Sequence, residues 1–253
     1  MGALTAERLI EGDGCAESVW REWLGAIDVP ALALEDFLPA PARLVVVAPH
    51  PDDEVLACGA LLAMHAARGG ECCVVAVTDG EASHPGSTRW TPQQLTTVRR
   101  AERAEGLLRL GLGGVSLHGL GLPDGGVQAQ ADRLRRRLID LLRPGDVVVA
   151  TWPLDGHPDH DACGTAAIQA CASVGCGLLT APVWMWHWAA PGDARVPWQR
   201  LRALHAHATA WKRKQAALEA HVSQCTAREG GQGSVLGADI LARAARQREY
   251  FFV

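Results

Sequence analysis

The order of apolar and polar stretches along the chain predicts a sheet covered by helices. Short apolar runs lie at residues 43–48, 72–78, 115–117 and 146–152. Each is followed by a segment with helical periodicity, so helices are expected at 54–69, 92–110, 129–142 and 158–173. Strands that are apolar throughout and alternate with helices are typical of a parallel sheet buried on both faces. The pattern therefore predicts an α/β fold with a mainly parallel sheet.

The remaining segments predict additions to this core. Residues 1–40 are expected to form a helical N-terminal extension, because Val19, Trp20, Trp23, Leu24 and Ile27 recur at helical spacing. A fifth strand is expected at about 181–188, followed by a helix at 208–220, a surface loop at 223–237 and a last helix at 238–248. We expect residues 1–253 to form a single domain.

Composition narrows the class of function. The chain has 253 residues, of which 48% are hydrophobic and 21% charged, with a net charge of −4. This acidic balance argues against nucleic acid as a partner. No apolar run approaches the length that spans a membrane, and no secretory signal is evident, so we expect a cytoplasmic location. The eight cysteines contain no Cys-x-x-Cys pair, which favours buried, reduced thiols.

The first polar cluster, His50-Pro51-Asp52-Asp53-Glu54, follows the first apolar run directly. Acids suit the N-terminus of a helix, so capping alone is one interpretation. Capping does not explain the histidine.

A second cluster repeats the pattern after the fourth expected strand: Asp155-Gly156-His157-Pro158-Asp159-His160-Asp161. In a doubly wound sheet of order 3-2-1-4-5, strands one and four are neighbours where ligands bind, beyond the carboxyl ends of the strands. With that order the two clusters would face each other, and we predict that they form one site.

The spacing of the residues suggests which role each of them has in the site. Residues three apart at a helix start project to one side, so His50 and Asp53 can reach one ion together, with His160 as the third ligand. Two imidazoles and a carboxylate suit one Zn²⁺ with a fourth position open for water. Asp52 would then accept the proton of that water, and His157 would stabilise an oxyanion or protonate a leaving group. The same ligands suit Fe²⁺, although non-haem iron oxygenases are usually jelly rolls.

Two further groups are candidates for substrate contact. Trp184, Trp186 and Trp188 alternate along the expected fifth strand and form either core or an aromatic wall for a substrate. His84 lies in a loop after the second strand that could overhang the site.

Both histidine clusters resemble the motifs of the PIG-L/LmbE-like zinc-dependent de-N-acetylases. The resemblance extends to Thr78-Asp79-Gly80-Glu81, to Arg99 with Glu102, to Leu122-Pro123-Asp124-Gly125, and to Lys212, Ala216, His221 and Gln224. It covers roughly residues 43–225 and leaves the N-terminal extension out.

The resemblance implies an LmbE-like, Rossmann-like fold and hydrolysis of an N-acetyl group from an amino sugar, such as an N-acetylglucosaminyl conjugate. The resemblance also implies that His50, Asp53 and His160 bind the metal. It implies that Asp52 is the general base and that His157 acts as the electrophile or the acid. Arg99 matches a position that contacts substrate hydroxyls in some members. Some members also use a tyrosine near the second cluster to stabilise the oxyanion. The sole tyrosine here is Tyr250, so we expect His157 to carry more of that step.

Three functions remain open from the sequence. The first is a zinc-dependent N-deacetylase acting on a small N-acylated amino sugar or glycoconjugate. The second is a zinc amidase acting on another amide, such as a sugar–thiol conjugate. The third is a non-catalytic Rossmann-type binding module. The sequence argues against this function, because no Gly-x-Gly-x-x-Gly motif for binding phosphates follows the first strand. A homo-oligomer is compatible with each.

Overall fold

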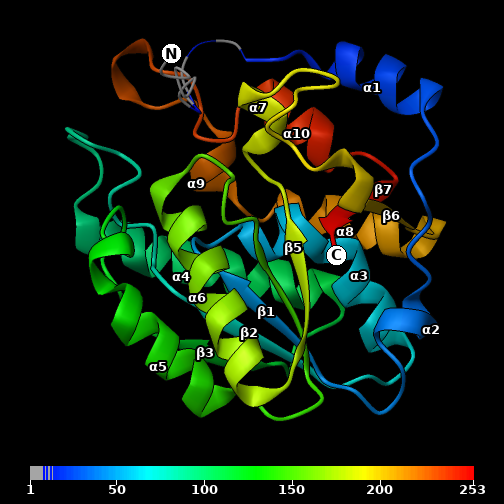
Figure 1. The fold of residues 1–253 in the computed structure, drawn as a ribbon. Coiled ribbons are helices and arrows are strands. Elements are labelled where there is room, and N and C mark those ends of the chain that lie inside the picture. The colour runs from blue at the N-terminus through cyan, green and yellow to red at the C-terminus, as the bar shows by residue number, and fades with distance from the viewer. Residues whose placement is uncertain (1–7, 9, 11, 13) are drawn as a thin grey trace, which may run out of the picture.

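A mostly parallel sheet forms the centre of the protein in a computed structural model that describes residues 8, 10, 12 and 14–253 (Figure 1). Its strands are β1 (Leu44–Ala48), β2 (Cys72–Ala76), β3 (Ser116–Gly119), β4 (Val147–Thr151), β5 (Gly177–Ala181), β6 (Leu201–His205) and β7 (Arg248–Phe252). They are arranged in the order β3-β2-β1-β4-β5-β7-β6. The first five are parallel, and β7 runs antiparallel to both of its neighbours. The predicted α/β class is confirmed, and the sheet has the 3-2-1-4-5 order on which the predicted meeting of the two clusters depends.

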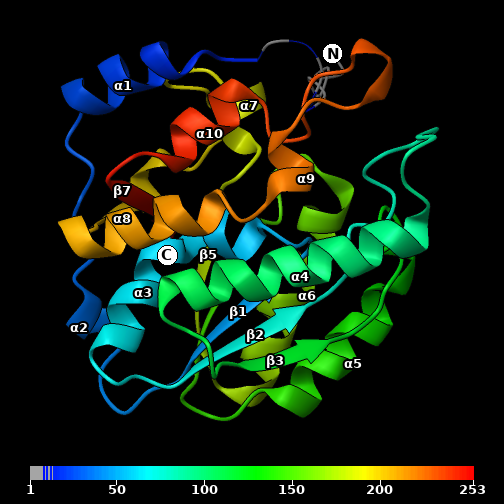
Figure 2. The same cartoon turned by 180° about the vertical axis from the view of Figure 1, so that it is seen from behind.

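Helices cover both faces of this sheet. On one face lie α3 (Asp53–Ala67), α4 (Pro92–Leu110) and α8 (Ala208–Leu218), which are in front in Figure 2. On the other face lie α5 (Ala131–Leu141), preceded by a short helix at Gln128–Gln130, and α6 (Pro158–Val174). The five helices predicted at these places are confirmed, with ends that differ by a few residues.

The apolar runs form strands because their side chains alternate between two cores. Leu44 and Val46 of β1 pack under α3, whereas Val45 and Val47 pack under α6. All five residues of β1 are buried. A strand buried on both faces must be apolar at every position, which is the pattern read from the sequence.

The N-terminal extension packs against a third apolar cluster. Helix α1 (Glu17–Ala26) buries Trp20, whose indole N–H donates to the Trp186 carbonyl at 2.7 Å. A short helix, α2 (Leu34–Phe37), leads from there into β1. The helix expected around Trp20 is confirmed, whereas residues 1–7, 9, 11 and 13 of the predicted extension lie outside the described residues.

The prediction of a fifth strand at 181–188 is wrong. Strand β5 ends at Ala181, Pro182 follows it, and Met185–Trp188 form the short helix α7. The Asp155 carboxylate accepts hydrogen bonds from the backbone N–H groups of Val183, Trp184 and Met185, which stabilises the start of a helical turn. The alternating tryptophans therefore do not mark a strand.

The C-terminal segment also differs from the prediction. The predicted loop at 223–237 overlaps a short helix, α9 (Val222–Cys225), and contains another short turn at Glu229–Gly231. The last helix, α10, covers Ala238–Ala244 and ends before the predicted 248, because the chain continues into β7. A further short turn at Trp198–Arg200 precedes β6.

The structure also bears on the cysteines and on membrane insertion. All eight cysteines are free, and Cys58, Cys72, Cys73, Cys163 and Cys171 are buried. Among the described residues, no helix combines the length and the apolar character needed to cross a membrane.

Candidate metal centre

The two polar clusters meet at the carboxyl ends of β1 and β4, which are paired in the sheet. His50 lies in the loop after β1, Asp53 is the first residue of α3, and His160 lies in the first turn of α6. The sequence-predicted residues are therefore brought together by the neighbouring positions of two strands that are about a hundred residues apart in the chain.

Asp53 is the hub of the centre. Its Oδ2 lies 3.2 Å from His50 Nδ1 and 3.2 Å from His160 Nε2. The nitrogen and oxygen atoms that these three residues offer lie within 4.8 Å of one another, and all three residues are buried. Within the part of the chain that the structure describes, His160 Nε2 has no hydrogen-bond partner, although it is buried. A buried, unpartnered imidazole nitrogen beside a carboxylate and a second imidazole fits a divalent cation such as Zn²⁺ or Fe²⁺.

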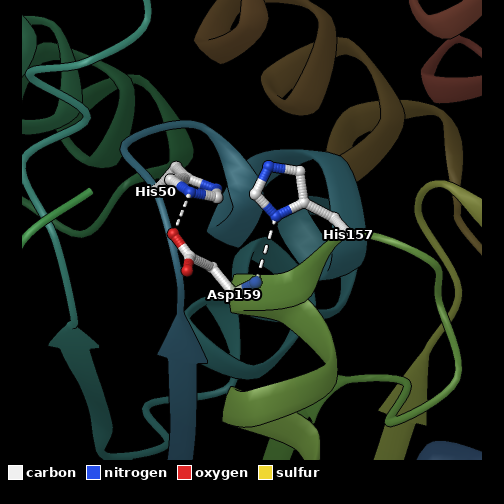
Figure 3. Close-up of side chains that lie close together, drawn as sticks. All are labelled: His50, His157 and Asp159. Atoms are coloured by element: carbon white, nitrogen blue, oxygen red, sulfur yellow. Dashed lines mark hydrogen bonds and ion pairs between the residues drawn. The ribbon is translucent and has the colours of Figure 1, made fainter. Parts of the chain in front are cut away.

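A second group of donors overlaps the first. Figure 3 shows the His50 and His157 rings next to each other above Asp159, whose Oδ2 lies 3.2 Å from His50 Nε2. Asp159 is already engaged, because its carboxylate accepts from the backbone N–H groups of Gly125 and Val127. His157 Nδ1 likewise accepts from the Asp159 N–H at 3.2 Å. The group of His50, Asp53 and His160 therefore fits a cation better.

Acids that the sequence reasoning did not assign hold the two histidines. The buried Asp155 places Oδ2 2.8 Å from His160 Nδ1, and its other oxygen accepts the N–H groups at the start of α7. Asp124 Oδ1 and Asp159 Oδ2 each lie 3.2 Å from His50 Nε2. Metal-ligating histidines normally donate their second ring nitrogen to such a partner. Asp155 and Asp159 belong to the second histidine cluster, and their position there was the available signal for them. Asp124 lies in the separate segment Leu122-Pro123-Asp124-Gly125, which only the family resemblance marked.

Asp52 has an unusual backbone and is buried. Its φ of 142° is positive, a conformation that L residues seldom adopt and that costs about 1–3 kcal/mol. Arg99 holds it in place by donating from one nitrogen to Asp52 Oδ2 at 3.2 Å and to the Pro51 carbonyl at 3.0 Å. Burial raises the pKa of Asp52 to about 7, although Arg99 acts in the opposite direction. Strain of this kind concentrates at functional sites.

The charges of the neighbouring histidines differ. Burial favours the neutral form of His160, but the Asp53 and Asp155 carboxylates outweigh it and raise the pKa of His160 to about 9. Burial, followed by the nearby His160 and His50, lowers the pKa of His157 to about 4. The acids thus create a place for positive charge between His50 and His160, whereas His157 is held neutral.

A cavity of about 280 Å³ opens above these residues. It is lined by the metal-centre residues together with Asp52, Arg99, His157, Trp184 and the apolar side chains of Leu56, Val235 and Leu236, among others. The Trp184 ring stacks on the His157 ring with centroids 6.4 Å apart. This is a concave, partly apolar site lined by several polar groups.

The other predicted substrate contacts lie elsewhere. Trp186 is in the core against Trp20, and Trp188 stacks on Trp152 while its indole N–H donates to the Asp155 carbonyl. His84 lines two separate depressions beside Arg228. The structure therefore brings Arg99 and Trp184 to the cavity, and not His84, Trp186 or Trp188.

Comparison with known proteins adds an independent line of support. Residues 45–171, which carry both histidine clusters, match the family model PIG-L, described as GlcNAc-PI de-N-acetylase. The chain is 36% identical over 163 residues to 1D-myo-inositol 2-acetamido-2-deoxy-alpha-D-glucopyranoside deacetylase of Mycobacterium leprae, covering 54% of this chain and 53% of that protein. The chain thus spans about half the length of the curated relatives it matches.

Solved structures share the fold. The conserved protein TT1542 from Thermus thermophilus is 29% identical with a TM-score of 0.59, covering 83% of this chain and 93% of its own. The zinc-inhibited form of teicoplanin deacetylase Orf2 is 25% identical with a TM-score of 0.54, covering 73% and 85%. The family model, the relatives and the shared fold all agree with the geometry of the two histidine clusters. The chain belongs to the PIG-L family of de-N-acetylases.

Proposed function

We propose that this chain is a metal-dependent hydrolase that removes an acetyl or other acyl group from the nitrogen of an amino-sugar-containing substrate. The observation that carries the proposal is the meeting of His50, Asp53 and His160 at the base of a cavity that Asp52 also lines. The names of relatives support the substrate class, since the Mycobacterium leprae protein is named as a deacetylase of an acetamido sugar.

His50, Asp53 and His160 would hold the cation, which we propose to be Zn²⁺. When bound, such a cation polarises a carbonyl and makes a water molecule a better nucleophile at neutral pH. The other steps belong to side chains of the chain itself.

Asp52 would act as the general base. Its carboxylate lines the cavity next to Asp53 and is oriented by Arg99. It would take a proton from the attacking water and return it to the nitrogen of the leaving amine. Because the Arg99 guanidinium also binds the Gly80 and Pro51 carbonyls, we assign Arg99 the role of orienting Asp52.

His157 would stabilise the developing oxyanion. Its Nδ1 accepts the Asp159 N–H, so in a neutral ring Nε2 carries the proton. Figure 3 shows these two nitrogens on opposite sides of the ring, with Nδ1 turned to Asp159. A hydrogen-bond donor aimed at the place where negative charge develops contributes several kcal/mol to catalysis. Trp184, stacked beside His157, would offer its indole face to the sugar ring.

The first prediction tests this assignment with Asp52→Asn. This variant should still bind Zn²⁺ and should lose about 10²–10⁴-fold in turnover, which is the range for removal of a general base. The measurement is acetate release from a panel of N-acetylglucosaminyl compounds, with metal content determined on the same samples.

Asp79→Asn is the matched control, because Asp79 pairs with Arg100 outside the cavity. It should retain wild-type turnover. Full activity of Asp52→Asn would remove Asp52 from the mechanism. Absence of acetate release by the metal-loaded wild type across the panel would overturn the proposed function.

A further inference from the structure

Helix α3 is broken one turn after the candidate metal centre. Cys58 has φ −150° and ψ 28°, which is not helical, although helix continues on both sides of it. The short first segment carries Asp53 and Leu56, and Leu56 lines the cavity above the centre. The break therefore separates the short segment that carries Asp53 from the rest of α3.

A buried ion pair occupies the break. In a continuous helix the Ala60 N–H would donate to the Leu56 carbonyl. Here Ala60 N–H donates to Glu249 Oε1 at 2.8 Å, and the Leu56 carbonyl accepts from Lys214 Nζ at 3.1 Å. Lys214 Nζ and Glu249 Oε1 lie 2.7 Å apart. The ion pair thus stands between the donor and the acceptor of one helical hydrogen bond.

The charges of the pair match the two helix ends that the break creates. Glu249 also accepts from the Leu61 N–H at 2.9 Å, so its carboxylate caps the second segment of α3 at the positive end of that segment. Lys214 lies at the carbonyl end of the first segment, where positive charge is favoured. The two side chains come from α8 and β7, and α8 packs along α3 (Figure 2).

Stability alone explains such a pair poorly. The Lys214 and Glu249 side chains are 3% and 1% exposed. Replacing a buried ion pair with apolar side chains of similar volume is often neutral or stabilising, because burial removes both charges from water. What apolar side chains cannot do is bind the Ala60 N–H and the Leu56 carbonyl, which would then rejoin in a straight helix.

We propose that Lys214 and Glu249 are positioning residues that keep α3 broken and thereby set the place of Asp53 in the centre. His160 is held independently of them, through Asp155 on the other side of the sheet crevice. Without the pair, Asp53 would shift relative to His160, and the ligand set would no longer converge. The inference rests on the proposed function only in taking this centre to bind a metal ion.

The test is the double variant Lys214→Met/Glu249→Met. The matched control is Arg43→Met/Asp146→Met, which removes another buried ion pair, located before β1 and β4 at the opposite end of the strands. Zn²⁺ affinity is measured by competition with a chromophoric chelator, and the visible spectrum of the Co²⁺-loaded protein reports the ligand geometry. We expect affinity to fall about 10–100-fold and the Co²⁺ spectrum to change in the first variant, with neither effect in the control.

Equal affinity and an unchanged spectrum in the two double variants would overturn the inference. If Lys214→Met/Glu249→Met does not fold, the isosteric Glu249→Gln is read by the same two measurements. A wild-type protein that binds no Zn²⁺ would instead contradict the proposed function. The two failures are therefore distinguishable.

Discussion

At the level of single residues, a carboxylate orients each of the two histidines of the candidate metal centre, His50 and His160. Each carboxylate lies against the ring nitrogen that is turned away from Asp53. Asp155 lies against His160 Nδ1, and Asp159 lies against His50 Nε2. An acceptor on one ring nitrogen fixes the tautomer and turns the other nitrogen toward the ion. The acids therefore decide which imidazole atoms are available as ligands.

This arrangement predicts the effect of Asp159→Asn. The amide keeps the size of the side chain but removes the negative charge beside His50 Nε2, so Zn²⁺ affinity should fall about 10–100-fold. Asp161→Asn is the control, because Asp161 lies at the same helix start and its Oδ1 accepts the Gly156 N–H, away from His50. Chelator competition on both variants checks the prediction, and equal affinities would exclude Asp159 from tuning the centre.

Among the helices and strands, the position of α6 depends on its close approach to the end of β4. A Cβ added at Gly164 would lie 2.4 Å from the Thr151 carbonyl oxygen and 2.7 Å from the Pro153 nitrogen. Both are backbone atoms that cannot move aside cheaply. Glycine at 164 thus lets the helix that carries His157 and His160 dock against the strand.

Gly164→Ala should therefore destabilise the protein by about 1–3 kcal/mol, the usual cost of overpacking. Gly177→Ala is the matched control, since its nearest non-neighbouring atom would be 3.6 Å away. The control should stay within about 0.5 kcal/mol of the wild type. Urea unfolding curves measure both, and a similar loss in the two variants would show that the close approach is unimportant.

The helices and strands that could be predicted are those whose pattern of apolar and polar residues has a single interpretation. Runs such as Leu44–Ala48 are apolar at every position and too short for a buried helix, so they indicate a strand covered on both faces. The tryptophans at 184, 186 and 188 led to the wrong prediction of a strand, because they alternate as strand residues do. The Asp155 carboxylate instead stabilises the start of a helical turn there. A carboxylate about thirty residues away in the chain leaves no local signal.

The site was predictable to a similar extent. His50, Asp53 and His160 stand at matched places in two clusters, so spacing and sheet order bring them together. The break in α3 could not be predicted, because Lys214 and Glu249 reach it from other elements. The resemblance pointed to Lys212, which is exposed, whereas Lys214 is the buried lysine.

For the protein as a whole, metal binding and folding should be linked. The proposed ligands come from the loop before α3, from α3 and from α6, so an ion held by all three would bind the folded chain and not the unfolded one. Free Zn²⁺ at about 100 times its Kd would add about 2.7 kcal/mol to the free energy of unfolding. For a chain of this size that corresponds to a rise in Tm of about 5–10 °C.

Thermal unfolding followed by circular dichroism, with Zn²⁺ and then with excess chelator, measures this shift. Asp53→Asn is the control, because it replaces the proposed ligand that lies against both histidines. It should show little or no rise in Tm. An equal rise in Asp53→Asn would mean that the stabilising ion binds elsewhere.

The place of β7 in the sheet has a consequence for the order of folding. β7 follows every other strand in the sequence, yet it lies between β5 and β6. β6 therefore cannot be added to the sheet in sequence order and must wait for β7. The same strand brings Glu249 to Ala60 across 189 residues of chain, a closure that is entropically costly and slow. The end of α3 that carries Asp53 would accordingly reach its final shape among the last events of folding, after the parallel strands have paired.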